Sequence, residues 1–221
     1  MSTHKKSKNL DNDDICFKII TLGNTGVGKS WIIKRFISDK FEPKAISTIR
    51  FGTFNKVIEL KDGTKVKLNL IDTAGQENYK ALSTSYLKNA DGVLFVFAND
   101  DRKSFEEIVE WIKIYKDACN NLDFSKQLPA YLIENKIDLE GGIIEKEEIE
   151  KIKNEYNIFG YAEVSSKNGQ NINEMFLDMG EMLIQIYGKK EKKQNLKLVK
   201  RPRKKKILPD MPYRCKIVNH M

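Results

Sequence analysis

The residues with the clearest chemistry form the sequence Gly23-Asn24-Thr25-Gly26-Val27-Gly28-Lys29-Ser30, which matches the phosphate-binding loop pattern of glycine, four residues, then glycine-lysine-serine. The glycines allow successive backbone N–H groups to point into one concavity, and the N-terminus of a following helix adds partial positive charge. Lys29 can then contact the outer phosphates, and the Ser30 hydroxyl can ligate a magnesium ion. The motif predicts a nucleoside triphosphate as the ligand.

Two further motifs come directly after apolar runs that are typical of strands. Asp72-Thr73-Ala74-Gly75-Gln76-Glu77 follows the run at 65–71, and Asn135-Lys136-Ile137-Asp138 follows the run at 129–134. Because open parallel sheets bind ligands at the carboxyl ends of their strands, we expect both motifs to lie beside the phosphate loop. Asp72 is then expected near the magnesium ion that Ser30 ligates.

The second of these motifs predicts which base is bound. The Asp138 carboxylate can accept hydrogen bonds from the ring N–H and the exocyclic amine of guanine, and adenine lacks this pair of donors. Ser165-Ser166-Lys167 follows a strand predicted over 160–164, and we expect it to close the same pocket with a backbone N–H and the lysine stem. The predicted base is guanine, which argues against the ATPase or kinase that the phosphate loop alone leaves open.

The elements that must position these motifs alternate along the chain. Asp62-Gly63 is a hairpin turn signal, and apolar residues recur at helical spacing from Phe105 to Tyr115 and from Ile172 to Ile186. This pattern predicts an α/β fold with a doubly wound, mostly parallel sheet and one antiparallel hairpin. The predicted strands are 15–22, 53–60, 65–71, 92–98, 129–134 and 160–164.

Composition limits the cellular context. The chain has 221 residues, of which 40% are hydrophobic, enough for one sizeable core. It contains no run of 18 apolar residues and no apolar stretch after its basic start, so neither a transmembrane helix nor a signal peptide is predicted and we expect a cytosolic protein. Cys16, Cys119 and Cys215 are widely separated, and reduced thiols are expected.

Charge is distributed unevenly. Residues 189–221 contain 13 lysines and arginines and two acidic residues, a net charge of +11, whereas the whole chain carries +8, so residues 1–188 carry −3. We therefore expect a flexible extension at 1–14, a globular domain at 15–188 and a basic, disordered tail at 189–221. The cluster within 189–206 can attract an anionic intracellular membrane, nucleic acid or a nuclear import receptor, and a solvated tail without a partner is the alternative.

Taken together and in this order, the motifs resemble those of the Ras superfamily of small GTPases, and most closely those of its Rab branch. The resemblance covers residues 15 to about 187 and includes the sequences at 23–30, 72–77, 135–138 and 165–167. It implies a P-loop NTPase G domain, with a six-stranded sheet and helices on both faces. It also implies GTP or GDP and Mg²⁺ as ligands, and slow hydrolysis of GTP by a molecular switch.

The resemblance also assigns roles to single residues. In the family a switch threonine lies 19 residues after the loop lysine and an aromatic residue that packs on guanine lies 12 after it, which selects Thr48 and Phe41. Gln76 is implied to be catalytic, because it would orient the attacking water. The implied metal residues are Ser30, Thr48 and Asp72. The implied nucleotide-binding residues are Gly23, Thr25, Gly26, Val27, Gly28, Lys29, Ser30, Trp31, Phe41, Thr48, Gly75, Asn135, Lys136, Asp138, Ser165, Ser166 and Lys167.

The loops around Thr48 and Gln76 are implied to bind an exchange factor, an activating protein and effectors, and we expect the protein to be a monomer. A Rab-like role in vesicle trafficking is implied. The alternatives are a nucleotide-locked scaffold without hydrolysis and a Rho- or Ras-like signalling GTPase. Residues 49–53 and Ile71 depart from the Rab pattern on the surface that Rab effectors read, so the usual Rab effectors are not implied. Cys215 is not at a prenylation position, so ordinary prenylation is not expected.

Overall fold

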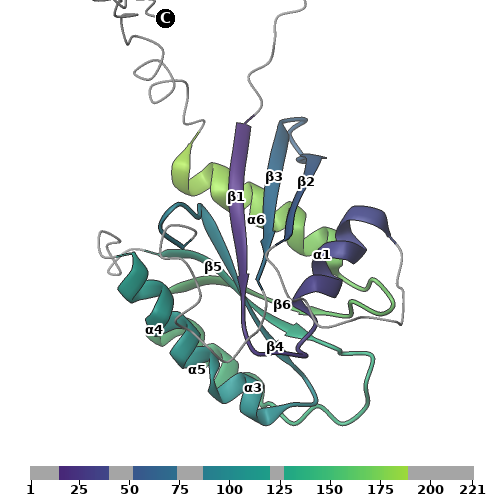
Figure 1. Ribbon diagram of the computed structural model, residues 1–221, viewed down its shortest axis with the longest axis vertical. Coiled ribbons are helices and arrows are strands. Elements are labelled where there is room, and N and C mark those ends of the chain that lie inside the picture. The colour runs from purple at the N-terminus through teal and green to yellow at the C-terminus, as the bar shows by residue number, and fades with distance from the viewer. Residues whose placement is uncertain (1–14, 40–51, 74–86, 120–126, 189–221) are drawn as a thin grey trace, which may run out of the picture. The chain divides into compact units, whose positions relative to one another are not determined.

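The computed structural model describes residues 15–39, 52–73, 87–119 and 127–188, and these form a six-stranded sheet with helices on both faces (Figure 1). The strand order is β2-β3-β1-β4-β5-β6, in which β2 is antiparallel to β3 and every other pair is parallel. The predicted fold class is confirmed. The elements are β1 (Ile15–Leu22), α1 (Lys29–Ser38), β2 (Gly52–Glu59), β3 (Lys65–Asp72), β4 (Gly92–Ala98), α3 (Arg102–Glu106), α4 (Ile108–Ala118), β5 (Leu128–Asn135), α5 (Lys146–Glu155), β6 (Ile158–Val164) and α6 (Ile172–Tyr187).

The central strands are apolar along nearly their whole length because helices cover both of their faces. Every residue of β4 and β5 is buried, which is typical of parallel strands in a doubly wound sheet. One core lies between the sheet and the helices α1 and α6, and it includes a stacked pair, Phe36 on Phe176, with ring centroids 3.9 Å apart. The other core lies under α3, α4 and α5 and includes Phe95 and Trp111.

Strand register brings the functional motifs to one edge. Ala98 of β4 is paired with Asn135 of β5, and Asn135 is paired with Val164 of β6. The residues that follow these three positions therefore leave the sheet side by side. Asp72 is the last residue of β3, which extends one residue beyond the predicted strand.

The helical stretch predicted from Phe105 to Tyr115 is two helices in the structure. α3 ends at Glu106 and α4 begins at Ile108, with Glu107 between them. Trp111, which the predicted apolar stripe did not include, is only 2% exposed and packs in the core beneath α4.

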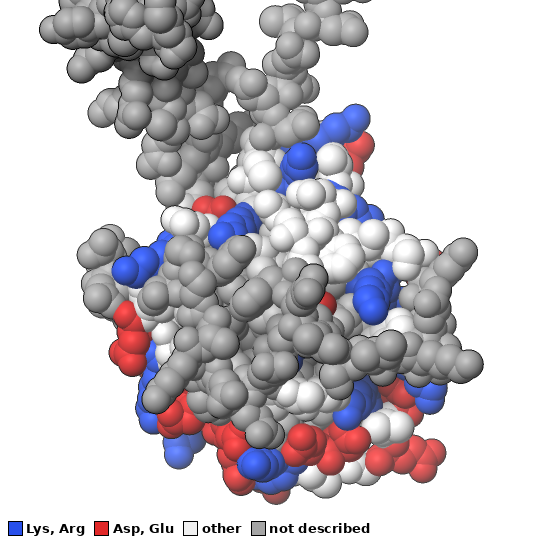
Figure 2. Space-filling view, viewed as in Figure 1, with Lys and Arg blue, Asp and Glu red and all other residues white. Residues whose placement is uncertain are grey.

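Charged side chains are mixed on the surface of the described domain. Figure 2 shows acidic and basic side chains next to one another along the lower edge of one face. Ion pairs between helices and within them contribute to this mixture, such as Arg102 with Glu148, whose atoms are 2.5 Å apart, and Lys153 with Glu150. Among the described helices, none is long and apolar enough to cross a membrane.

Candidate nucleotide-binding site

The phosphate loop connects β1 to α1 and has the backbone that its glycines predict. Gly23, Gly26 and Gly28 have φ values of 144°, 83° and 96°, which L side chains rarely adopt. At Gly28 a Cβ would also lie 2.2 Å from Nδ2 of Asn135, so the loop touches the base-reading motif at this point. Only glycine fits both the conformation and the contact.

Lys29 begins α1 and is 4% exposed. Its Nζ donates hydrogen bonds to the backbone oxygens of Gly23 at 2.7 Å and Asn24 at 2.5 Å. Burial lowers the pKa of Lys29 to about 8, and attraction to Asp72 only partly opposes this shift. A buried ammonium held against two loop carbonyls is well placed to receive phosphate oxygens as further acceptors.

Asp72 is 3% exposed, and its Oδ1 accepts no hydrogen bond from the described residues. Burial raises the pKa of Asp72, while a hydrogen bond from the Ser30 side chain and the positive charge of Lys29 oppose the shift. An unpaired, buried carboxylate oxygen beside a hydroxyl suits a hard divalent cation, so these residues fit Mg²⁺. The neighbouring strands are also tied together, because Thr73 Oγ1 donates to the Thr21 oxygen at 2.6 Å.

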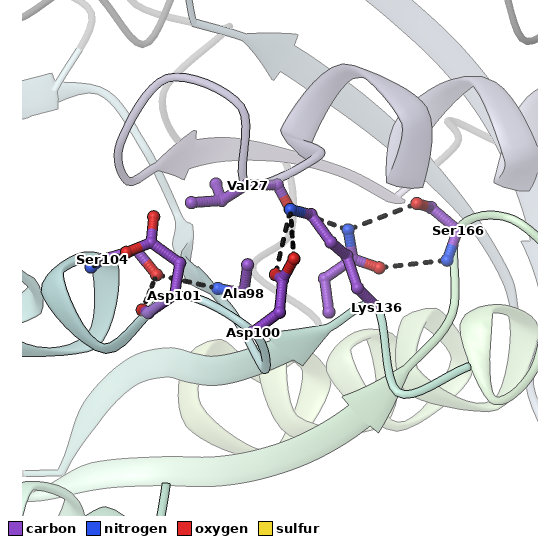
Figure 3. A network of polar contacts seen from close by, with 8 residues as sticks. Val27, Ala98, Asp100, Asp101, Ser104, Lys136 and Ser166 are labelled. Atoms are coloured by element: carbon purple, nitrogen blue, oxygen red, sulfur yellow. Dashed lines mark hydrogen bonds and ion pairs between the residues drawn. The ribbon is translucent and has the colours of Figure 1, made fainter. Parts of the chain in front are cut away.

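Asn135 joins the base-reading loops to the phosphate loop. Its side chain is fully buried, and Nδ2 donates to the Val27 oxygen at 2.8 Å and to Ser166 Oγ at 3.2 Å. The Ser166 N–H donates in return to Asn135 Oδ1 at 3.0 Å. Figure 3 shows Val27 and Ser166 on either side of this junction. A single amide therefore holds three segments that are far apart in the sequence.

Asp138, the predicted guanine acceptor, lies against the 165–167 motif. Its side chain is 13% exposed, and its Oδ1 accepts a hydrogen bond from Ser165 Oγ at 2.6 Å. Its Oδ2 lies 3.3 Å from Lys167 Nζ, with which it forms an ion pair. Burial opposes ionisation, but the hydrogen bonds from Ser165 and Lys167 outweigh it and leave the pKa of Asp138 below its ordinary value. The group is thus a carboxylate at neutral pH, as guanine recognition requires.

Lys136 has a positive φ of 69°, and its Nζ lies 3.0 Å from Asp100 Oδ1 (Figure 3). The turn that carries Asp100 is itself held by Ser104, whose Oγ donates to the Asp101 oxygen at 2.7 Å and accepts from the Ala98 N–H at 3.0 Å. Asp100 was missed at the sequence level. Its position two residues after the apolar run at 92–98, at the same edge as the other motifs, is the signal that could have found it.

Comparison with known proteins agrees with this geometry. The Ras family model matches residues 18–185. The chain belongs to the Ras family. Ras-related protein SEC4 of Saccharomyces cerevisiae is 34% identical over 177 residues, which are 80% of this chain and 79% of that protein. Ras-related protein Rab-13 of Bos taurus is 34% identical over 82% of this chain and 87% of its own length. Ras-related protein Rab-8 of Diplobatis ommata is 31% identical over 93% and 98%.

As a Ras family member the chain is a small GTPase, and the predicted resemblance is confirmed. The structure brings the phosphate loop, Asp72, the 135–138 motif and the 165–167 motif to one edge of the sheet. Thr25 is exposed in the loop, and Trp31 is half-buried in α1 with Lys34 Nζ 5.0 Å from its ring centroid. The nucleotide-binding and metal-binding roles of all the predicted site residues stay predictions. Four predicted residues lie outside the described part of the chain: Phe41, Thr48, Gly75 and Gln76.

Proposed function

We propose that this small GTPase is a GTP-dependent switch that reads guanine through Asp138 and holds the phosphates through Lys29. The observation that carries the proposal is the junction at Asn135, which joins the phosphate loop at Val27 to the base-reading loop at Ser166. A single nucleotide can bridge these loops, because its phosphates need the hydrogen-bond donors of the phosphate loop and its guanine base needs an acceptor at the other end of the site.

The geometry supports the roles proposed for Lys29, Ser30 and Asp72, and family membership supports those proposed for Thr48, Gly75 and Gln76. Ser30, Thr48 and Asp72 would hold Mg²⁺, which when bound neutralises charge on the β- and γ-phosphates. Lys29 supplies a fixed positive charge from a nearly water-free position. Gln76 orients the attacking water, and the backbone N–H of Gly75 contacts the γ-phosphate. The loops that carry Thr48 and Gly75 would relax when that phosphate is lost, and hydrolysis is slow without an activating protein.

The switch would act on other proteins through the loops around Thr48 and Gln76, which bind an exchange factor, an activating protein and effectors. Similarity to Rab-13, Rab-8 and SEC4 supports a Rab-like role in vesicle trafficking. Ile71 differs from the usual Rab residue, but it is 2% exposed and belongs to the core under α3, α4 and α5, so this difference lies in the core and not on the surface that effectors were expected to read. We further propose that the protein is a monomer with a G domain at 15–188 and a basic tail at 189–221 that attaches to anionic membrane.

The decisive experiment identifies the nucleotide and its turnover. Purified protein is heated, and the released nucleotide is separated chromatographically; GDP or GTP is expected. Phosphate release from GTP is then measured for the wild type and for Gln76→Leu, with and without cell extract as a source of activating protein. We expect Gln76→Leu to retain nucleotide and lose turnover, because Gln76 acts on water rather than on binding.

Other results would change the assignment. Release of ATP would overturn the role of Asp138. Bound GTP with no phosphate release from the wild type, even with extract, would indicate the nucleotide-locked scaffold. Equal turnover by the wild type and Gln76→Leu would show that another group orients the water.

A further inference from the structure

Asn24, the second residue of the phosphate loop, contacts Glu107, which precedes α4, and Trp111 of α4 through the two polar atoms of its side chain. Its Nδ2 donates to Glu107 Oε2 at 2.7 Å, and its Oδ1 accepts from Trp111 Nε1 at 2.9 Å. These partners lie 83 and 87 residues away in the sequence. The amide can satisfy both only in one orientation, because the carboxylate accepts and the indole donates.

The two partners are themselves held in place. Trp111 is 2% exposed in the core beneath α4, and it lies one helical turn after Glu107. Glu107 occupies the break between α3 and α4, where its backbone N–H is bonded to the Lys103 oxygen. Glu107 at the break therefore presents a fixed acceptor to Asn24, and Trp111 one turn later presents a fixed donor.

The backbone of Asn24 leads directly to the phosphate-binding lysine. Its carbonyl oxygen accepts the 2.5 Å hydrogen bond from Lys29 Nζ. On the other side of the peptide, Gly23 is in close contact with β4, because a Cβ there would lie 2.1 Å from the Val96 oxygen. Rotation of the Asn24 peptide would consequently remove one of the two carbonyls that orient Lys29.

We propose that Glu107 and Trp111 are positioning residues for the phosphate loop, which hold Asn24 so that Lys29 and the loop N–H groups are oriented before the nucleotide arrives. The inference rests on the proposed nucleotide-binding function and adds Glu107, which precedes α4, and Trp111 of α4 to the determinants of nucleotide release. A preorganised loop binds phosphate without first losing conformational entropy, so loss of the contact accelerates release of the nucleotide.

A double-mutant cycle tests the pairing. Asn24→Asp sets a carboxylate against the Glu107 carboxylate, and Glu107→Gln supplies an amide that can donate to it, while Trp111 still has an acceptor. Dissociation of fluorescently labelled GDP is measured in excess unlabelled GDP with Mg²⁺. We expect about tenfold faster release for Asn24→Asp, a smaller effect for Glu107→Gln, and for the double variant an acceleration at least threefold smaller than the product of the two single effects.

Repulsion between the new carboxylate and the phosphates acts equally in the single and the double variant, so it does not enter the coupling. If the effects of the two substitutions simply multiply, the proposed pairing is wrong. If no variant and not even the wild type binds labelled GDP, the failure belongs to the proposed function instead.

A second comparison separates positioning from packing. Trp111→Phe removes the indole donor but keeps a ring in the core, and Tyr115→Phe removes a polar atom from a residue one turn further along α4 that is 1% exposed. Trp111→Phe should release GDP several-fold faster, about threefold or more, while Tyr115→Phe leaves the rate unchanged. Equal acceleration by both would show that the helix acts through core packing alone, which would overturn the proposal.

Discussion

At the scale of single residues, the site depends on two ionisable groups whose surroundings act oppositely on their charged forms, disfavouring that of Lys29 and favouring that of Asp138. Lys29 is kept nearly free of water and its pKa is lowered to about 8, whereas the pKa of Asp138 is below its ordinary value because Ser165 and Lys167 stabilise the carboxylate. The Lys29 ammonium would gain a partner from a bound phosphate, and the Asp138 carboxylate is already charged for the proposed contact with guanine. Each property predicts a measurable behaviour.

The lowered pKa of Lys29 predicts that nucleotide binding takes up protons at alkaline pH. Phosphate stabilises the ammonium form, so protein that has lost this proton above pH 8 must regain it on binding. We expect GDP affinity to be flat near pH 7 and to fall above pH 8, by up to about tenfold per pH unit. Calorimetry in buffers of different ionisation enthalpy measures the proton uptake, which should rise toward one per Lys29.

The free energy of unfolding of the nucleotide-free protein should rise with pH, whereas GDP affinity falls. The folded-state pKa lies below the ordinary value of 10.5, so the energetic cost of the buried charge is fully present below pH 8 and is relieved as the pH rises from 8 toward 10.5. If the number of protons taken up on GDP binding does not change between about pH 7 and 9, the assignment of Lys29 as the phosphate ligand is contradicted.

Removal of the Asp138 carboxylate tests base recognition. Asp138→Ala should weaken GDP and GTP binding by about 3 kcal/mol or more, because guanine loses two charge-assisted hydrogen bonds and its donors are left unpaired. Competition with labelled GDP measures the change in affinity, and ATP should not displace labelled GDP from either protein. Glu140→Ala, which removes an exposed carboxylate two residues away, is the matched control and should bind as the wild type does. Comparable affinity of the wild type for ATP and GTP would refute guanine specificity.

At the scale of elements, α1 supports both ends of the nucleotide site. Its first residue is Lys29, and further along the same helix Arg35 Nη2 donates to the Asn168 oxygen at 2.8 Å. Gly169 lies against this guanidinium, since a Cβ there would be 2.7 Å from Arg35 Nε. The loop that carries Ser165 is thus fastened to the helix that begins at the phosphate loop.

Loss of this fastening should loosen the base-reading loop. Arg35→Ala is expected to accelerate hydrogen exchange of the amides in 165–171 and to weaken GDP binding by about 1 kcal/mol, because a hydrogen bond from a charged donor is lost. Hydrogen exchange followed by mass spectrometry measures the first effect and GDP titration the second. Lys151→Ala, on an exposed position of α5, is the control. Unchanged exchange in 165–171 would show that the loop is held by its own hydrogen bonds, such as the 2.8 Å bond from Gly169 N–H to the Ser165 oxygen.

At the scale of the whole molecule, the charge of the chain is divided. Residues 1–188 carry −3 and residues 189–221 carry +11, as the difference from the total of +8 shows. The described surface mixes both signs along the edge seen in Figure 2. Attraction to an anionic surface should therefore depend on the tail rather than on the G domain.

The tail should confer salt-sensitive membrane binding. Full-length protein is expected to bind vesicles that contain phosphatidylserine and to leave neutral ones unbound, with binding lost as the screening length falls from about 10 Å at 0.1 M salt to about 3 Å at 1 M. Truncation after Gly188 should abolish sedimentation with the vesicles and preserve GDP binding. Nuclear accumulation of a fluorescent tail fusion, without vesicle binding, would favour an import receptor as the partner.

The motifs that the structure brings together could be recognised from the sequence because each of them is local in the sequence. The phosphate loop at 23–30 and the base motif at 135–138 are contiguous, and their residue types determine which part of a nucleotide they can bind. The strands were predicted to within two residues at each end because their apolar runs end where they leave the core, as at Ala98. Periodicity missed the break at Glu107, since the apolar spacing continues across it.

The contacts that orient these motifs were decided by the tertiary structure alone. Lys136 meets Asp100 across 36 residues of sequence, Trp111 meets Asn24 across 87, and Arg35 meets Asn168 across 133. Each of these contacts depends on strand order and on where a helix crosses the sheet. A local pattern of apolar and polar residues does not encode either, because it specifies which face of an element is buried and not what lies opposite.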